Sequence, residues 1–158
     1  MWYNILMIVF EKSVGAAVFR RRGEETIMYL LLHYRGGHWD FPKGHVEKDE
    51  SDSETLRREV IEETGITDLD ILPGFKRSSR YFYRAKESER VERQQAGRFI
   101  NIAKKVVYYL AETKTKNVTI SKEHTGYEWL GYGDALKRLT YANSKNVLLK
   151  ANNCLQKE

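Results

Sequence analysis

The sequence contains a single cysteine, Cys154, and only two prolines among its 158 residues. One cysteine cannot form an internal disulfide or a cysteine-based metal cluster, so we expect a reducing compartment and assign the protein to the cytoplasm. The first ten residues, MWYNILMIVF, are too few to span a membrane and lack the leading basic region of a signal peptide. We interpret them as a strand start or a tail. We expect no membrane association, and no motif in the chain points to a protein partner.

Low-complexity tracts and internal repeats are also absent, and the length predicts one domain over 1–158 with a sizeable core. The net charge of +5 is unevenly distributed. Positions 44–66 carry eight Asp or Glu against three Lys or Arg, whereas positions 76–105 carry ten Lys or Arg against three Glu. An acidic site beside a basic segment suits a metal-bound polyanion as the substrate.

One stretch, 44–66 (GHVEKDESDSETLRREVIEETGI), places acidic residues, an arginine and two glycines at a distinctive spacing. The first glycine is followed after five residues by a glutamate, and seven residues later by an Arg-Glu pair. Two adjacent glutamates and the second glycine complete the pattern. The positions are Gly44, Glu50, Arg58, Glu59, Glu62, Glu63 and Gly65, with aliphatic residues at 60 and 66.

Positions 53–64 contain no Gly or Pro and predict a helix, on which Glu59, Glu62 and Glu63 fall within an arc of roughly 100°. Leu56 and Val60 lie beside that arc and would press the helix onto a sheet, leaving the carboxylates at the rim of the contact. At about 5 Å and an effective dielectric of 20, each like-charge pair there costs roughly 3 kcal/mol. A hard divalent cation would remove this cost, so the pattern predicts a metal site rather than an ordinary solvated acidic face.

Glu50 and Arg58 are better interpreted as supports than as ligands, because an arginine can hold a carboxylate in one orientation; a plain surface ion pair is the alternative. Gly44 and Gly65 fit positions that need close approach or a positive φ, before the helix and at its end.

Apolar and β-branched runs bounded by turn residues predict the strands. They lie at 14–19, 26–33, 69–72, 75–83, 105–113 and 127–130. The segment 34–52 contains several glycines and a proline and predicts a long irregular loop with a functional role.

Two further helices are expected. One is short and spans 133–139. The other is capped by Ser144, and its Val147, Leu148, Ala151 and Leu155 form one apolar face. Strands mixed with a few helices indicate an α/β fold with a sheet covered on both faces.

The stretch at 44–66 resembles the signature of Nudix hydrolases at every fixed position. This resemblance implies an α/β/α sandwich with a mixed sheet. The preceding residues, HWDFPKGHVE at 38–47, look like the branch of asymmetrical diadenosine tetraphosphate hydrolases, the bis(5′-nucleosyl)-tetraphosphatases. Further similarity at 74–77, 107–112, 123–124 and 127–131 extends the likeness from about 14 to 149.

Carried over position by position, the likeness implies that His38 and Lys43 contact the polyphosphate. Tyr81 and Tyr141 match tyrosines that hold adenine, and Glu123 matches a glutamate that approaches the metals from the opposite side. Each of these residues also has a plainer interpretation, as a solvated, turn or core residue. The chain departs from the branch at 84–104, where shorter members turn quickly and this sequence inserts RAKESERVERQQAGRFINIAK.

We therefore expect an Mg²⁺-dependent hydrolase, with Mn²⁺ as a possible substitute, that splits diadenosine tetraphosphate into ATP and AMP by attack of water on phosphorus. Glu59, Glu62, Glu63 and Glu123 are the expected metal ligands, and either Glu59 or Glu123 takes the proton from water. The inserted segment leaves two alternatives for the basic residues, a solvated loop at 86–95 or contact with an RNA 5′ end as in RNA pyrophosphohydrolases. A non-catalytic nucleotide-binding module would normally lack one of the acidic ligands, and all are present here.

Overall fold

The computed structural model describes residues 7–157, and an eight-stranded mixed β-sheet forms its centre. The main path runs β3-β2-β1-β7-β5, while β4 pairs with β1, β6 with β7 and β8 with β2. Only β1 and β7 are parallel; every other pairing is antiparallel. The strands are β1 (Ile8–Arg22), β2 (Thr26–Tyr34), β3 (Trp39–Asp40), β4 (Lys43–His45), β5 (Asp70–Ile71), β6 (Arg77–Arg84), β7 (Asn101–Glu112) and β8 (His124–Leu130).

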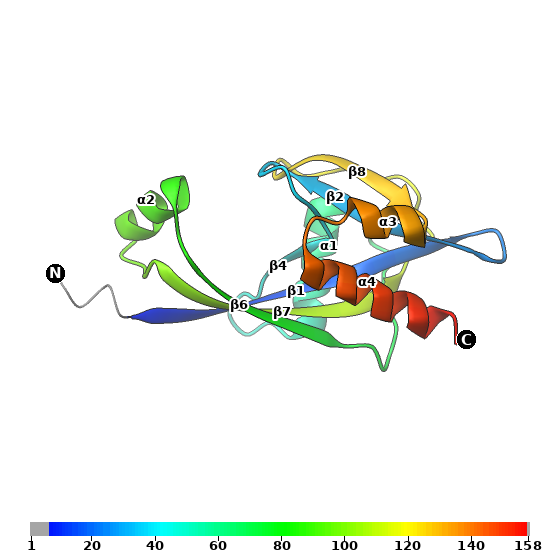
Figure 1. Ribbon diagram of the computed structural model, residues 1–158, viewed down its shortest axis with the longest axis horizontal. Coiled ribbons are helices and arrows are strands. Elements are labelled where there is room, and N and C mark those ends of the chain that lie inside the picture. The colour runs from blue at the N-terminus through cyan, green and yellow to red at the C-terminus, as the bar shows by residue number, and fades with distance from the viewer. Residues whose placement is uncertain (1–6, 158) are drawn as a thin grey trace.

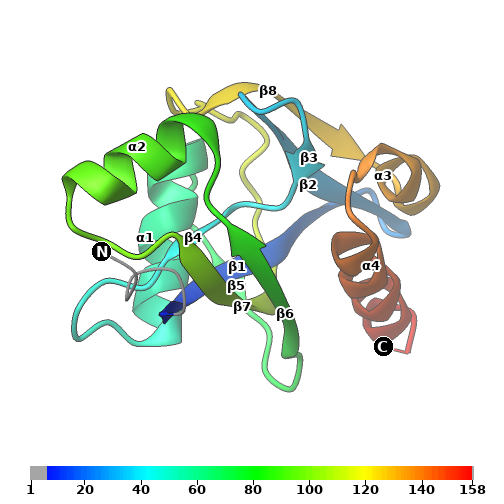
Figure 2. The same cartoon turned by 60° about the vertical axis from the view of Figure 1, so that its left-hand side comes forward.

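Helices cover both faces of this sheet (Figures 1 and 2). Because side chains alternate along β1, Ala17 and Phe19 pack in one core with α3 (Tyr132–Arg138) and α4 (Ala142–Leu155). Val14, Ala16 and Val18 point the other way, toward a second core. That core contains Leu56 and Val60 of α1 (Asp52–Thr64). The α/β/α sandwich with a mixed sheet is therefore confirmed.

Local interactions define both ends of α1. Ser51 is the N-cap: its hydroxyl accepts from the backbone of Glu54, whose side chain accepts in turn from the Ser51 backbone. Gly65 ends the helix in a left-handed conformation, with φ 73°, as expected for this glycine. The helix thus starts one residue earlier than expected, and its ends hold the acidic face in register with the sheet.

The last helix begins two residues before the expected cap, so the capping role assigned to Ser144 is wrong. Tyr141 occupies the N-cap position without a side-chain bond, and Ser144 lies inside the first turn. It is 1% exposed and is a hydrogen-bonding partner of Tyr108. The expected apolar face of α4 is confirmed by the burial of Val147 and Leu148 together with 151 and 155.

Two segments expected to be irregular contain regular structure. The stretch 34–52 includes the short strands β3 and β4, because each finds a long strand to pair with. The residues at 86–95, for which a solvated loop was one reading, form the helix α2 (Glu87–Gln95). β1 begins at Ile8, so part of the apolar N-terminal run starts a strand, and positions 1–6 lie outside the described residues.

Within 7–157, no helix is both long and apolar enough to cross a membrane.

Candidate active site

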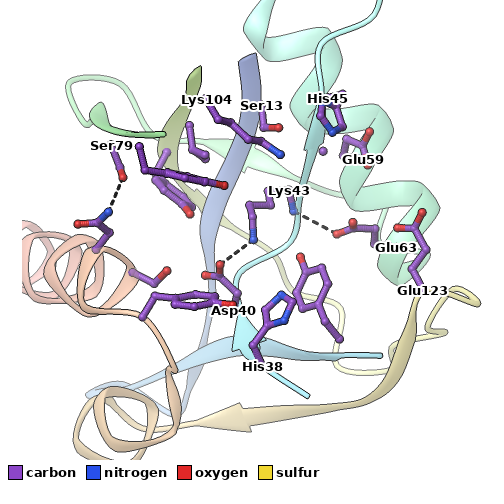
Figure 3. A pocket seen from close by; sticks show the side chains of 18 of the residues that line it. Ser13, His38, Asp40, Lys43, His45, Glu59, Glu63, Ser79, Lys104 and Glu123 are labelled. Atoms are coloured by element: carbon purple, nitrogen blue, oxygen red, sulfur yellow. Dashed lines mark hydrogen bonds and ion pairs between the residues drawn. The ribbon is translucent and has the colours of Figure 1, made fainter. Parts of the chain in front are cut away.

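A pocket of about 890 Å³ opens between the acidic face of α1 and the start of α4. Glu59, Glu63 and Glu123 lie along one side of it, and Lys43 lies near its centre (Figure 3). His38 and Asp40 are at one end, while His45 and Lys104 are found toward the other. Strand β6 runs along the pocket and presents Ser79, Tyr81 and Tyr83 to it.

The glutamates of α1 differ strongly in exposure. The side chain of Glu63 is 3% exposed and that of Glu59 12%, whereas Glu62 is 58% exposed and does not line the pocket. The helical period accounts for this, since Glu63 lies about 40° from Glu59 on the core side and Glu62 about 60° away on the solvent side. The structure therefore brings two of the three α1 carboxylates into the pocket.

Burial makes Glu63 an unusual carboxyl group. Desolvation raises the pKa of Glu63 to about 9, and the negative charges of Glu59 and Glu123 add to the effect. The backbone N–H of Lys43 donates to Glu63 Oε2 at 3.1 Å and acts in the opposite direction. Burial also raises the pKa of Glu59, although its hydrogen bond with Arg58 lowers it. Two clustered, poorly solvated carboxyl groups would be stabilised in their ionised form by a bound cation.

Arg58 connects the acidic residues, as the sequence predicted. Its Nε and Nη2 donate to Glu50 at 2.6 and 2.9 Å, and its Nη1 donates to Glu59 Oε1 at 2.7 Å. A weaker bond of 3.3 Å reaches Glu62, and Nη2 also donates to the backbone oxygen of His45 at 2.8 Å. Neither Glu50 nor Arg58 lines the pocket, so the two residues support Glu59 from outside it.

Gly44 is required by close approach. A Cβ at this position would lie 1.9 Å from the carboxyl carbon of Glu59. Gly44 pairs with Val14 in the sheet, so the strand cannot move aside without breaking that pairing. The absence of a side chain lets the Glu59 carboxylate rest against β4.

Lys43 is held over the pocket by two partners that the sequence analysis did not identify. Its Nζ donates to Asp40 Oδ2 at 2.6 Å and lies 4.8 Å from the centre of the Tyr34 ring. Asp40 is 2% exposed, and the Tyr34 hydroxyl donates to the Phe41 carbonyl at 2.8 Å. The ammonium group of Lys43 is therefore held inside the pocket beside Asp40 instead of being freely solvated (Figure 3).

Aromatic rings surround one end of the pocket. His38 stacks on Tyr34 with ring centres 4.5 Å apart and lies 5.4 Å from Tyr141. Burial, then the charge of Lys43, lowers the pKa of His38, so its imidazole is mainly neutral at pH 7. Tyr81 and Tyr141 both line the pocket and are 39% and 49% exposed, which leaves ring surface available to a ligand.

Glu123 reaches the pocket from the loop before β8 and lies beside Glu63 of α1 (Figure 3). Its neighbour His124 is buried, and its Nε2 lies 3.9 Å from Glu63 Oε1 without a hydrogen-bond partner among the described residues. Burial and the charge of Lys43 lower the pKa of His124 to about 4. The pocket thus gathers every residue expected to bind substrate, and Glu59, Glu63 and Glu123 of the expected metal ligands.

A profile of the NUDIX domain family matches residues 9–151. The chain belongs to the NUDIX family. The asymmetrical bis(5′-nucleosyl)-tetraphosphatase of Mus musculus is 37% identical over 155 residues, covering 91% of this chain and 95% of that protein. A crystal structure of the C. elegans Ap4A hydrolase binary complex superposes with a TM-score of 0.75 at 29% identity, covering 94% of this chain and 99% of the other. The RNA pyrophosphohydrolase of Helicobacter pylori is 28% identical over 107 residues, covering 65% of this chain and 64% of its own.

The donor set of this NUDIX protein fits a divalent cation in its chemistry. Glu59, Glu63 and Glu123 offer the carboxylate oxygens that hard cations prefer, and burial followed by the charge of Glu59 raises the pKa of Glu63, which a bound cation would offset. Within 7–157, no three acidic, histidine or cysteine side chains are already gathered around one point. Arg58 instead engages Glu59.

Other residues of the NUDIX pocket escaped the sequence analysis. Asp40 and Tyr34 support Lys43. Tyr83 lines the pocket directly before the inserted segment, and Glu89 and Lys104 line it from within that segment. The only signal for Asp40 was its position three residues before Lys43. Tyr83 and Glu89 carry no sequence signal, because their orientation depends on how the inserted segment folds.

Proposed function

We propose that this NUDIX protein hydrolyses dinucleoside polyphosphates and splits diadenosine tetraphosphate (Ap4A) into ATP and AMP. The observation that carries the proposal is the pairing of an acidic wall, Glu59, Glu63 and Glu123, with the fixed ammonium group of Lys43 across one pocket. Such a pocket suits a polyphosphate chain bound with a cation. Similarity to proteins named for this activity in Mus musculus and C. elegans supports the choice of substrate.

Hydrolysis requires a water oxygen to bond to one phosphorus while a bridging phosphorus–oxygen bond breaks. The proton released by the water passes to a carboxylate, for which Glu59 and Glu123 are the two candidates. Arg58 contributes by holding Glu59 at 2.7 Å in a single orientation. The two products then leave as a nucleoside triphosphate and a nucleoside monophosphate.

We assign Glu59, Glu62, Glu63 and Glu123 to the binding of Mg²⁺, for which Mn²⁺ can substitute. When bound, such a cation lowers the pKa of water and neutralises charge on phosphate oxygens. The solvent-side position of Glu62 suits an outer ligand, while the burial of Glu63 suits one that is already desolvated.

The remaining residues of the pocket supply the contacts with the substrate. Lys43 offers a point charge to phosphate oxygens, and neutral His38 offers a hydrogen bond without adding charge. Tyr81 and Tyr141 offer ring faces to adenine. We place the enzyme in the cytoplasm, on the basis of its single free cysteine.

The test is a panel of Mg²⁺-dependent hydrolysis assays with products separated by chromatography. Diadenosine polyphosphates, nucleoside triphosphates, ADP-ribose, and capped and triphosphorylated RNA are the substrates. Ap4A should give the highest kcat/KM and yield ATP and AMP in equal amounts. Glu63→Gln should abolish turnover with the fold intact, whereas Glu25→Gln, in the exposed turn between β1 and β2, should not. Faster cleavage of ADP-ribose would contradict the proposal.

RNA 5′-pyrophosphohydrolysis is the second candidate, because the Helicobacter pylori relative carries that name and the inserted segment is basic. The structure weakens the charge argument, since Arg93 of this segment is 5% exposed and paired with Glu11 and Glu89. Faster cleavage of triphosphorylated RNA than of Ap4A in the same panel would select this candidate.

A further inference from the structure

The inserted segment between β6 and β7 (84–104) folds into an arm together with the preceding Tyr83, and we call this unit the α2 arm (residues 83–104). α2 lies above the end of the sheet where β1 begins, far from α4 (Figures 1 and 2). Ala85, Ile100 and Ile102 form a small buried cluster at its base, against which Val9 and Tyr83 pack. The arm therefore has a core of its own joined to β1 and is not a solvated loop.

A buried arginine attaches α2 to the sheet. Arg93 is 5% exposed, and its Nη2 donates to Glu11 Oε1 of β1 at 2.8 Å. Its Nε donates to Glu89 Oε1 at 2.9 Å, and its Nη1 donates to the carbonyl oxygen of Phe99 at 3.3 Å. Leaving the buried guanidinium group of Arg93 without these partners would be costly, so the pairing fixes the position of α2 on the sheet.

The α2 arm supplies part of the pocket wall. Tyr83, Glu89 and Lys104 all line the cavity. Tyr81 also lines the cavity, and its ring centre lies 6.0 Å from that of Tyr83. Lys104 and His38 lie at opposite ends in the close view, with Lys43 between them (Figure 3). The cavity is thus elongated, and from Ser79 to Tyr83 the strand alone covers about 13 Å.

The chemistry at the α2 end differs from that of a phosphate site. Glu89 Oε1 accepts from the Tyr83 hydroxyl at 3.0 Å and from Arg93, whereas Oε2 accepts no hydrogen bond from the described residues. A carboxylate repels phosphate but accepts from hydroxyl and amino groups. Beside it, the Tyr83 ring offers a stacking surface. A carboxylate that can accept hydrogen bonds, next to an aromatic ring, suits the ribose hydroxyls and the base of a nucleoside.

We propose that the α2 arm forms a subsite for the second nucleoside of a dinucleoside polyphosphate. The first nucleoside lies at Tyr141 and on the side of Tyr81 that is turned away from Tyr83, whose ring centre is 6.0 Å from that of Tyr81. The phosphates pass Lys43 and Lys104. At the far end Glu89 accepts hydrogen bonds from ribose hydroxyls or from the base amino group, and Tyr83 contacts the base. This inference rests on the proposed function and assigns the second half of that substrate.

The experiment compares Ap4A with adenosine 5′-tetraphosphate (p4A), because the two compounds differ only in the second nucleoside. KM is measured for Ap4A, and the inhibition constant is measured for p4A as a competitor. Glu89→Gln keeps the side-chain shape but replaces one carboxylate oxygen by an amide nitrogen. In this variant KM for Ap4A divided by the inhibition constant for p4A should rise about tenfold. Glu89→Asp withdraws the carboxylate by one methylene group and should also raise the ratio. Glu92→Gln, on the same helix but exposed and outside the pocket, should leave the ratio unchanged.

An unchanged ratio in both Glu89 variants, with wild-type thermal stability, would overturn the subsite. Equal weakening of Ap4A and p4A would also overturn it, because it would place Glu89 beside the shared half of the two ligands. A wild-type enzyme that cleaves other NUDIX substrates but not Ap4A would instead overturn the proposed function, and the subsite with it.

Discussion

The guanidinium group of Arg58 binds the Glu50 carboxylate through two parallel hydrogen bonds, Nε to Oε1 at 2.6 Å and Nη2 to Oε2 at 2.9 Å. The bonds from Arg58, followed by one from the Glu47 backbone, lower the pKa of Glu50 from 4.5 to about 2. The same guanidinium group contacts Glu59 in the pocket. The ion pair outside the pocket therefore controls the orientation of a carboxylate inside it.

This pairing predicts how stability depends on acidity. Because the pKa of Glu50 is lower in the folded state than in the unfolded chain, ionised Glu50 stabilises the fold above pH 4.5. That contribution is lost as the pH falls from 4.5 through about 2. Thermal unfolding followed by circular dichroism between pH 2 and 6 should show a steeper loss of Tm in the wild type than in Glu50→Gln. Glu24→Gln, in the exposed β1–β2 turn, should retain the wild-type slope; equal slopes in all three proteins would contradict the prediction.

Gly44→Ala should lower kcat/KM by about 100-fold, because displacement of a catalytic group by about 1 Å can cost that much. The added methyl group overlaps the Glu59 carboxyl group, which can rotate away, so the fold should survive. Gly133→Ala is the matched control, since no atom lies within 4 Å of the added Cβ and the position is helical. Steady-state kinetics of Ap4A cleavage provide the measurement. Wild-type activity in Gly44→Ala would show that the orientation of Glu59 is unimportant.

Tyr81→Ala and Tyr141→Ala should each raise KM for Ap4A by roughly 5- to 150-fold, which corresponds to about 1–3 kcal/mol per stacked base. Tyr→Phe at either position keeps the ring and should stay within about threefold of wild type. Tyr127→Ala removes an exposed tyrosine from β8 outside the pocket and should leave KM unchanged. If the alanine variants matched their phenylalanine counterparts, stacking would not be the role of these rings.

Metal addition should stabilise the protein through Glu63. A ligand at 100 times its Kd adds about 2.7 kcal/mol, which for a chain of this length corresponds to a rise in Tm of about 5–10 °C. Saturating Mg²⁺ should produce this rise in wild type, and EDTA should reverse it. In Glu63→Gln this rise in Tm should largely disappear, because the variant lacks the buried carboxylate that the cation would bind. Differential scanning fluorimetry with Mg²⁺, Mn²⁺ and Na⁺ would measure it, and an equal rise in both proteins would place the cation elsewhere.

Several features of the protein could be predicted from sequence because they depend on neighbouring residues. The acidic face of α1 follows from the helical period, and Gly65 ends the helix through its own left-handed backbone. The support of Glu59 by Arg58 is equally local. The Ser144 cap was wrong because the position of α4 on the sheet, rather than a polar side chain, determines where that helix begins.

The sequence by itself determined the chemical type of the site. The glutamates of α1 lie within about one helical turn, and Gly44 lies on β4, the strand that directly precedes this helix. Only the tertiary structure decided which carboxylates enter the pocket, and that Asp40 and Tyr34 hold Lys43 there. It also decided that the inserted segment becomes a pocket wall, since Arg93 meets Glu11 across 82 residues of chain. Contacts of this kind depend on strand register and helix placement, which no local pattern of residues specifies.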